Sequence, residues 1–153
     1  MIKIIDDVLS KIEMQEFIFY YEDNKSAEHT FDGERDSKIY KFKGISIIDN
    51  YNRFSFFKKI KYQNYDRLRI QLVDNSIEMV LQPHTHVTPY SFIIFLNEDF
   101  DGGDVIFDNV RVKPKKGQMI YFSGDQGHFV ENILSGNRYT LIGFLKDNQF
   151  DFV

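Results

Sequence analysis

The residues best suited to chemistry are three histidines, His84, His86 and His128. His84 and His86 are one residue apart, and alternate residues of an extended strand point to the same face. Both imidazoles can therefore point at one metal ion, and Pro83 just before them indicates a sheet edge. His128 follows an apolar strand, and strands far apart in sequence meet inside an antiparallel barrel.

Three imidazoles from two strands fill half of an octahedron and leave three positions open. A redox metal needs such positions to bind a bidentate substrate and dioxygen. Three of the chain's four histidines fit this pattern, and we expect His29, in a polar stretch, to lie outside it. The alternative, that each histidine is a core or surface residue with a satisfied hydrogen bond, stays open.

Arg138 stands ten residues after His128, at the start of a strand expected to run back beside it. An arginine inside a barrel is costly unless it is paired, and its planar fork suits a carboxylate. The alternative is a surface arginine that pairs with Glu131 or Asp125.

The composition narrows the possible sites and partners. The absence of cysteine excludes disulfides, thiolate zinc sites and a cysteine nucleophile, so a metal must use His, Asp or Glu. The net charge of −4 gives no general attraction to nucleic acid or anionic lipid. No apolar run approaches the roughly 20 residues of a membrane span. The first residues turn acidic too soon for a signal peptide, so we expect a soluble cytoplasmic protein.

The elements that position these residues can be read from hydrophobic spacing. We expect a helix over about 7–21 with Asp6 or Asp7 as its N-terminal cap, and a loop over 22–37. The region 40–65 is mixed, with a short helix or strand around Phe54 to Ile60. Short strands separated by turn residues then predict a β-sandwich or jelly roll: 68–73, 77–81, 91–96, 105–107, 110–112, 118–122 and 139–145.

The stretch 84–145 resembles the 2-oxoglutarate- and Fe(II)-dependent dioxygenases, especially their prolyl 4-hydroxylase-like branch. His84-Thr85-His86 stands where that family has His-x-Asp, and His128 with Arg138 resembles its distal histidine and basic residue. Three further segments match the family in order: 92–97 resembles its apolar strand, 101–107 its Gly-Gly-Glu-Thr-x-Phe segment and 112–117 its Pro-x-x-Gly turn.

The resemblance implies a mainly β fold, a double-stranded β-helix (jelly roll, cupin-like barrel) with N-terminal flanking helices. It implies one domain over 1–153, with a mixed part over about 1–65 and a core over about 66–146. Fe(II), 2-oxoglutarate and O2 would be the cofactor and cosubstrates. His84 and His128 would be the two iron-binding imidazoles, with His86 in the place of the family's carboxylate ligand. Arg138 would hold the distal carboxylate of 2-oxoglutarate with help from Ser91. The substrate would be a prolyl residue of a peptide or protein, or a small molecule.

The main departure from the family is His86, which replaces a carboxylate ligand and removes one negative charge. Asp104, Asp125 or Glu131 can supply a carboxylate instead. Two other functions stay open: a three-histidine cupin enzyme that does not use 2-oxoglutarate, and a β-helix binding module without activity. The oligomeric state is not readable from the sequence.

Overall fold

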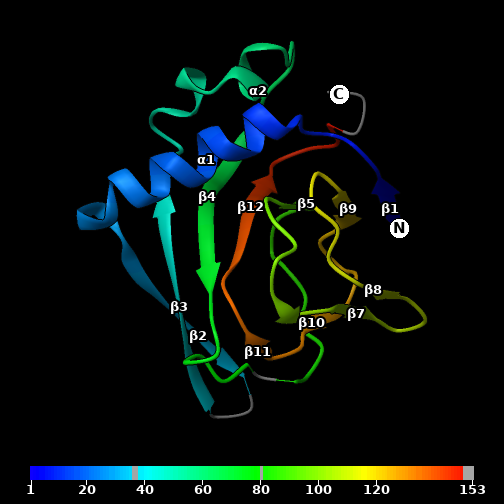
Figure 1. Cartoon of the computed structure of the whole chain (residues 1–153). Coiled ribbons are helices and arrows are strands. Elements are labelled where there is room, and N and C mark those ends of the chain that lie inside the picture. Colours follow the sequence, from blue (N-terminus) through cyan, green and yellow to red (C-terminus); the bar gives the residue numbers. More distant parts are fainter. Residues whose placement is uncertain (36–37, 80, 150–153) are drawn as a thin grey trace.

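The computed structural model describes residues 1–35, 38–79 and 81–149, and it is organised around one large antiparallel sheet (Figure 1). Seven strands form this sheet, and neighbours in the sheet are mostly distant in sequence. In spatial order they are β1 (Ile2–Ile5), β9 (Met119–Ser123), β5 (Tyr90–Phe95), β12 (Arg138–Leu145), β4 (Tyr65–Val73), β3 (Lys38–Ser46) and β2 (His29–Arg35).

Two smaller sheets complete the strand arrangement. One contains β10 (His128–Val130), β7 (Val105–Phe107) and β8 (Arg111–Val112), and the other pairs β11 (Ile133–Ser135) with β6 (Asp101–Gly102). An apolar cluster joins the large sheet to the three-stranded one, because Ile93, Phe122 and Ile142 pack with Val105 and Phe107. This arrangement confirms the predicted mainly β, jelly-roll class.

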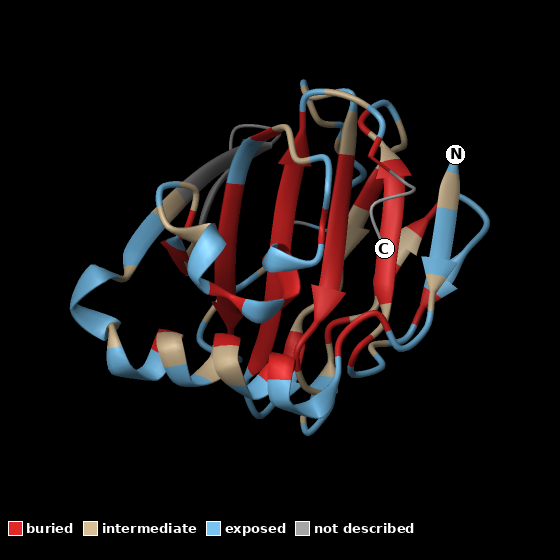
Figure 2. Cartoon of the chain, turned by 90° about the horizontal axis from the view of Figure 1, so that it is seen from above, coloured by how far each residue is buried: buried red, intermediate tan, exposed pale blue. Residues whose placement is uncertain are grey.

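Helices cover the other face of the large sheet. They are α1 (Lys11–Asp23) and α2 (Ser55–Lys58), with the 3-10 turns η1 (Lys25–Ala27) and η2 (Tyr51–Arg53). Phe17 of α1 and Phe57 of α2 belong to the same buried cluster as Ile70 and Leu141 of the sheet. Figure 2 shows the buried central strands behind half-exposed helices. Since core packing fills this face, a site within the sheet must lie on the opposite face.

The first helix begins later than predicted. It starts at Lys11, and Ser10 rather than Asp6 or Asp7 is its N-cap. The Ser10 hydroxyl accepts from the Glu13 amide at 3.2 Å, and the Glu13 carboxylate accepts from the Ser10 amide at 2.9 Å. This capping box satisfies two amides of the first turn, which Asp7, with a φ of 54°, does not do.

The prediction of a loop over 22–37 is wrong for His29–Arg35, which form β2 and pair with β3, and residues 36–37 lie outside the described part. An edge strand is often polar, since charged residues there discourage pairing with another chain. The sequence of such a strand is therefore as polar as that of a loop, which explains the wrong prediction. Residues 54–60, which were compatible with either element, contain the short helix α2.

The predicted strand over 77–81 is also wrong for its described residues, and Val80 lies outside them. Ile77 and Met79 belong to an irregular connection that links β4 to β5. Asp74 ends β4 there, because its carboxylate accepts hydrogen bonds from the Ser76 amide and hydroxyl. Such a side-chain turn offers the backbone an alternative to the sheet ladder.

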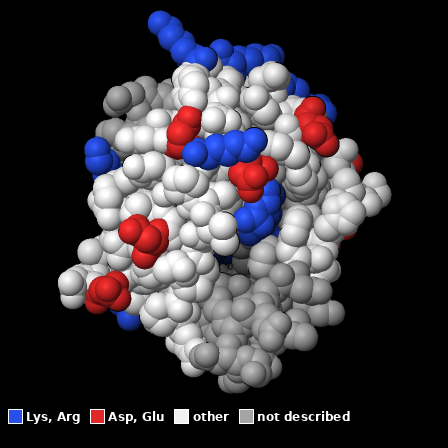
Figure 3. Space-filling model, turned by 180° about the vertical axis from the view of Figure 1, so that it is seen from behind, with Lys and Arg blue, Asp and Glu red and all other residues white. Residues whose placement is uncertain are grey.

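The surface of the molecule carries charges of both signs, as Figure 3 shows for the face seen from behind, which is hollowed near its centre. None of the helices in the described ranges combines the length and apolar character needed to cross a membrane.

Candidate metal-binding site

Two of the three candidate histidines lie on the irregular connection between β4 and β5. His84 forms an isolated bridge with His128 of β10, with amide-to-carbonyl distances of 2.9 and 3.0 Å. The His86 amide donates to the Gly124 carbonyl at 2.7 Å. The chain is therefore extended here without being part of the large sheet. His84 and His86 are half-buried and Thr85 between them is exposed, as the alternation predicted.

The three imidazoles lie close together. The Nε2 atoms of His84 and His86 are 3.2 Å apart, and one ring nitrogen from each of the three histidines lies within 4.8 Å of the others. Two neighbouring ligands at right angles, each about 2.1 Å from a metal, would be about 3.0 Å apart. The spacing of His84 and His86 thus fits two adjacent positions of a metal.

The opposite nitrogens of two rings contact groups that orient them. His86 Nδ1 lies 2.7 Å from the Ser91 hydroxyl, and His128 Nδ1 lies 3.1 Å from the Gln126 carbonyl. A carbonyl only accepts, so this contact requires a proton on Nδ1 of His128 and leaves Nε2 as the nitrogen that can bind a metal. Such contacts fix the tautomer and orientation of metal-binding histidines.

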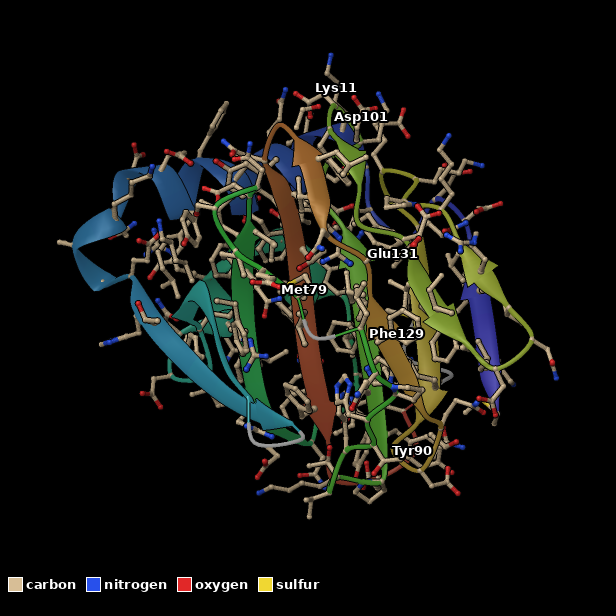
Figure 4. The ribbon with its side chains drawn as sticks, turned by 90° about the horizontal axis from the view of Figure 1, so that it is seen from below. Lys11, Met79, Tyr90, Asp101, Phe129 and Glu131 are labelled. Carbon is tan, nitrogen blue, oxygen red and sulfur yellow. The ribbon has the colours of Figure 1, made fainter. Side chains whose placement is uncertain are left out.

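A cavity of about 200 Å³ opens at the histidines, on the sheet face that the helices leave uncovered. In Figure 4 the connection that bears Met79 crosses this face near β12, and β10 with Phe129 runs beside it. None of the described residues that line the cavity is acidic. They are Phe42, Arg67, Arg69, Gln71, Met79, His84, His86, Ser91, Phe92, Ile93, Phe122, His128, Val130, Arg138, Ile142 and Phe144.

Arg138 lines the same cavity and is only 1 % exposed, which excludes the alternative of a surface arginine. Its guanidinium lies 5.3 Å from the centre of the Phe95 ring. Burial lowers the pKa of Arg138 to about 10, although the charge of Asp104 acts in the opposite direction. Arg138 is therefore still charged at neutral pH. Its Nε and Nη2 have no hydrogen-bond partner among the described residues, so two buried donors are available to an anionic ligand.

Ser91, the hydroxyl residue expected to assist Arg138, is on β5 and does not lie near Arg138. Ser91 is paired with Phe144 at the far end of β12, and it contacts His86 instead. Thr140 stands two residues after Arg138 on the same face of β12, and its buried hydroxyl also lacks a partner among the described residues. Our sequence reading missed Thr140. The sequence feature that could have identified it is its position two residues after Arg138, because alternate residues of a strand share a face and the other residues on this face of β12 are large.

The three acidic residues considered as replacement ligands do not join the histidines. Asp104 and Glu131 both pair with the exposed Arg111, and Asp125 is exposed. His29 is exposed on the edge strand β2, and it is not part of the histidine group. Within the described residues, the candidate ligand set is therefore three imidazoles without a carboxylate.

Comparison with known sequences gives the family. The profile of the 2OG-Fe(II) oxygenase superfamily, where 2OG is 2-oxoglutarate, matches residues 61–146, more than half of the chain. This chain belongs to the 2OG-Fe(II) oxygenase superfamily. A curated relative, prolyl 3-hydroxylase 2 of Mus musculus, is 40 % identical over 58 residues. The match covers 32 % of this chain and 8 % of that protein, so the chain spans less than a tenth of its relative.

Solved structures of this superfamily share the fold. The prolyl hydroxylase of Trichoplax adhaerens, in complex with a peptide fragment of the hypoxia inducible factor oxygen degradation domain, superposes with a TM-score of 0.71 at 12 % identity. The superposition covers 95 % of this chain and 83 % of that one. The viral collagen prolyl hydroxylase of Paramecium Bursaria Chlorella virus-1, in its 2OG complex, gives 0.61 at 14 % identity and covers 97 % and 96 %. These similarities confirm the predicted double-stranded β-helix.

Proposed function

We propose that this superfamily member is a 2-oxoglutarate- and Fe(II)-dependent hydroxylase of a C–H bond. One observation carries the proposal: the three imidazoles open into the same cavity as the buried guanidinium of Arg138, whose Nε and Nη2 lack a partner among the described residues. The first group fits a divalent metal and the second fits the far carboxylate of a diacid. A three-histidine cupin enzyme would have no use for Arg138 in this place.

His84, His86 and His128 would hold the iron through their ring nitrogens. When bound, Fe(II) supplies the activation of dioxygen that is coupled to conversion of 2-oxoglutarate to succinate and carbon dioxide. Ser91 and Gln126 would keep the rings of His86 and His128 in the orientation that binds metal.

Arg138 and Thr140 would position the cosubstrate. A guanidinium can donate two parallel hydrogen bonds to a carboxylate, and the Thr140 hydroxyl can donate a third. These bonds form in a cavity with aromatic walls. Phe122 and Phe144 lie 5.7 and 5.0 Å from the His86 ring, measured between ring centres. Exclusion of water by these rings strengthens the charged contact and protects the reaction.

For the substrate we propose a prolyl residue in a peptide, or a related small molecule. The support comes from the relatives: the matched mammalian protein is named a prolyl 3-hydroxylase, and one of the similar structures holds a peptide fragment. The absence of a strong positive field over the whole chain argues against nucleic acid.

The test is a calorimetric titration of anaerobic protein with Mn(II), followed by 2-oxoglutarate. We expect one metal per chain, and 2-oxoglutarate binding that depends on the metal. His128→Ala should lose the metal and with it the cosubstrate, while the exposed-site variant Arg53→Gln should keep both. Metal binding without 2-oxoglutarate binding would favour the cupin function. Binding of both without succinate from the Fe(II) form in air, with or without a substrate, would favour a binding module.

A further inference from the structure

One neutral side chain in the cavity, that of Gln71 on β4, is oriented by a contact that fixes both ends of its amide. Gln71 lines the cavity and is 7 % exposed. The Nε of Arg69 donates to its Oε1 at 3.0 Å. Since an arginine nitrogen donates and does not accept, the carbonyl end of the amide must face Arg69. The amide nitrogen Nε2, with its two hydrogens, is therefore the end that remains for another partner.

The two hydrogens on Nε2 have no acceptor within the part of the chain that the structure describes, where the bond from Arg69 is the one hydrogen bond of this side chain. The residue opposite Gln71 on β12 is Thr140, whose buried hydroxyl also lacks a described partner. Burial of a polar group without a partner costs free energy, so such groups are normally hydrogen-bonded. A ligand that presents an acceptor to Nε2 would remove this cost.

Gln71 differs in this respect from Ser91, the other described lining residue with a neutral amide or hydroxyl in its side chain. The Ser91 hydroxyl lies 2.7 Å from Nδ1 of His86, so it already contacts a candidate metal ligand. The Nε2 group of Gln71 has no such task. Among the described lining residues, it is therefore the neutral donor that is available to a ligand.

Gln71 stands on the side of the proposed cosubstrate that faces away from the metal ligands. In the large sheet, β12 lies between β5, whose Ser91 contacts His86, and β4, which carries Gln71. Adjacent strands are about 4.8 Å apart, so about 10 Å of sheet separates β5 from β4. In the proposed function, 2-oxoglutarate extends from the histidines to Arg138 and Thr140 on β12. Gln71, one strand further on, borders the space that remains for the substrate.

We infer that Gln71 donates a hydrogen bond from Nε2 to a backbone carbonyl of a peptide substrate, and thereby positions the C–H bond that is hydroxylated. The inference rests on the proposed function and adds to it the residue that recognises the substrate and the group that it recognises. A peptide carbonyl fits because it is a neutral acceptor, and a neutral pair avoids the cost of burying a further charge.

The test compares a peptide with isosteres that each lack one carbonyl, by calorimetry on the anaerobic Mn(II) form of the full chain with 2-oxoglutarate. A panel of tripeptides, acetyl-Gly-Xaa-Gly-amide with each common residue at Xaa, including Pro, gives the tightest binder. Each amide bond of that peptide is then replaced, one at a time, by an E-alkene of the same shape. We expect one replacement to weaken binding about tenfold, because it leaves the Gln71 donor buried without an acceptor.

Variants assign this preference for the carbonyl to Gln71. Gln71→Glu keeps an acceptor for Arg69 and replaces the donors, while Gln71→Met keeps the length of the side chain and removes both polar groups. The preference for the carbonyl over the alkene should disappear in both variants. Gln15→Glu and Gln15→Met, at an exposed position of α1, are the matched controls and should retain it. A purely structural role of Gln71 would weaken binding of both ligands and leave the preference unchanged.

Circular dichroism checks the fold of each variant. If Gln71→Met does not fold, Gln71→Glu decides the result, because it retains the contact with Arg69. Three results would overturn the inference: no binding by any peptide of the panel, no alkene that binds more weakly than its parent, and a preference that survives substitution of Gln71.

Each titration is also run without 2-oxoglutarate, which separates this inference from the proposed function. If the Mn(II) form does not bind 2-oxoglutarate, the proposed function fails, and the carbonyl preference is still measured on the metal form alone. If 2-oxoglutarate binds normally and no carbonyl is preferred, only the inference fails. Loss of 2-oxoglutarate binding in folded Gln71→Met would assign Gln71 to the cosubstrate and overturn the inference as well.

Discussion

Replacing Arg138 with methionine should stabilise the protein and lower its affinity for 2-oxoglutarate. Methionine keeps the length and apolar stem of the side chain and removes the buried charge. In the absence of the cosubstrate, that charge has Nε and Nη2 without partners among the described residues, so the folded protein bears the cost of its burial.

The magnitude follows from the pKa of Arg138, which burial lowers from the ordinary value of an arginine to about 10. At about 1.4 kcal/mol per pKa unit, the charged form destabilises the folded state by about 3 kcal/mol. A base whose folded pKa is lowered carries this cost at every pH below that pKa, so it is complete at pH 7. The substitution also removes the contact of the guanidinium with the Phe95 ring, which destabilises the folded state by about 1 kcal/mol. The expected gain is about 2 kcal/mol, or roughly 4–8 °C in Tm.

Differential scanning calorimetry of the metal-free protein measures the gain, and titration of the Mn(II) form measures 2-oxoglutarate affinity. We expect the Kd for 2-oxoglutarate to rise about tenfold to a hundredfold, because a charged hydrogen-bonded pair is lost. Arg53→Met, which removes an exposed arginine, is the control for both measurements. A destabilised Arg138→Met with unchanged 2-oxoglutarate affinity would refute the reasoning and make Arg138 a structural residue.

Three further predictions concern the metal group and the fold. His86→Asp should still bind Mn(II), with an affinity of the same order measured by calorimetry, and a collapse of binding would show that a carboxylate cannot replace this ring. Gly143→Ala should lower the free energy of unfolding by about 1–3 kcal/mol in urea denaturation, because the added methyl overlaps the Phe92 ring. Burial acts to raise the pKa of Glu13, but hydrogen bonds from Lys59 and the capped helix end outweigh it, and the pKa is lowered. Glu13 therefore stabilises the fold above its ordinary pKa of 4.5, and this contribution should fade in acid melts of wild type but not of Glu13→Gln.

The centre of the site was accessible to sequence reasoning because it depends on short-range alternation. His84 and His86 share a face whenever the backbone is extended, whatever the sheet around them does. Arg138 lines the same cavity as the histidines, although the strand that begins there does not run back beside His128 as predicted: β12 pairs with β4 and β5, whereas β10 pairs with β7. These relations survive errors in the prediction of the surrounding elements. Binding of iron and 2-oxoglutarate by these residues stays a prediction.

Features that depend on long-range packing were not accessible. The pairing of Ser91 with Phe144 rather than with a residue near Arg138 is a matter of register between strands, which one sequence does not specify. The same holds for Arg69, whose place in the cavity depends on the pairing of β4 with β12. Thr140 became visible as a candidate only when its hydroxyl was found buried without a described partner.

The connection 74–89 has a consequence for how the protein responds to its metal. It carries His84 and His86, and backbone hydrogen bonds of these two residues with His128 and Gly124 connect this part of it to the barrel. A metal ion bound by His84, His86 and His128 would link this connection to β10. Metal binding would therefore stabilise the ordered conformation of the connection, and order of the connection would favour metal binding. Chelation should therefore expose the connection to proteases and hydrogen exchange before the helices or the large sheet loosen.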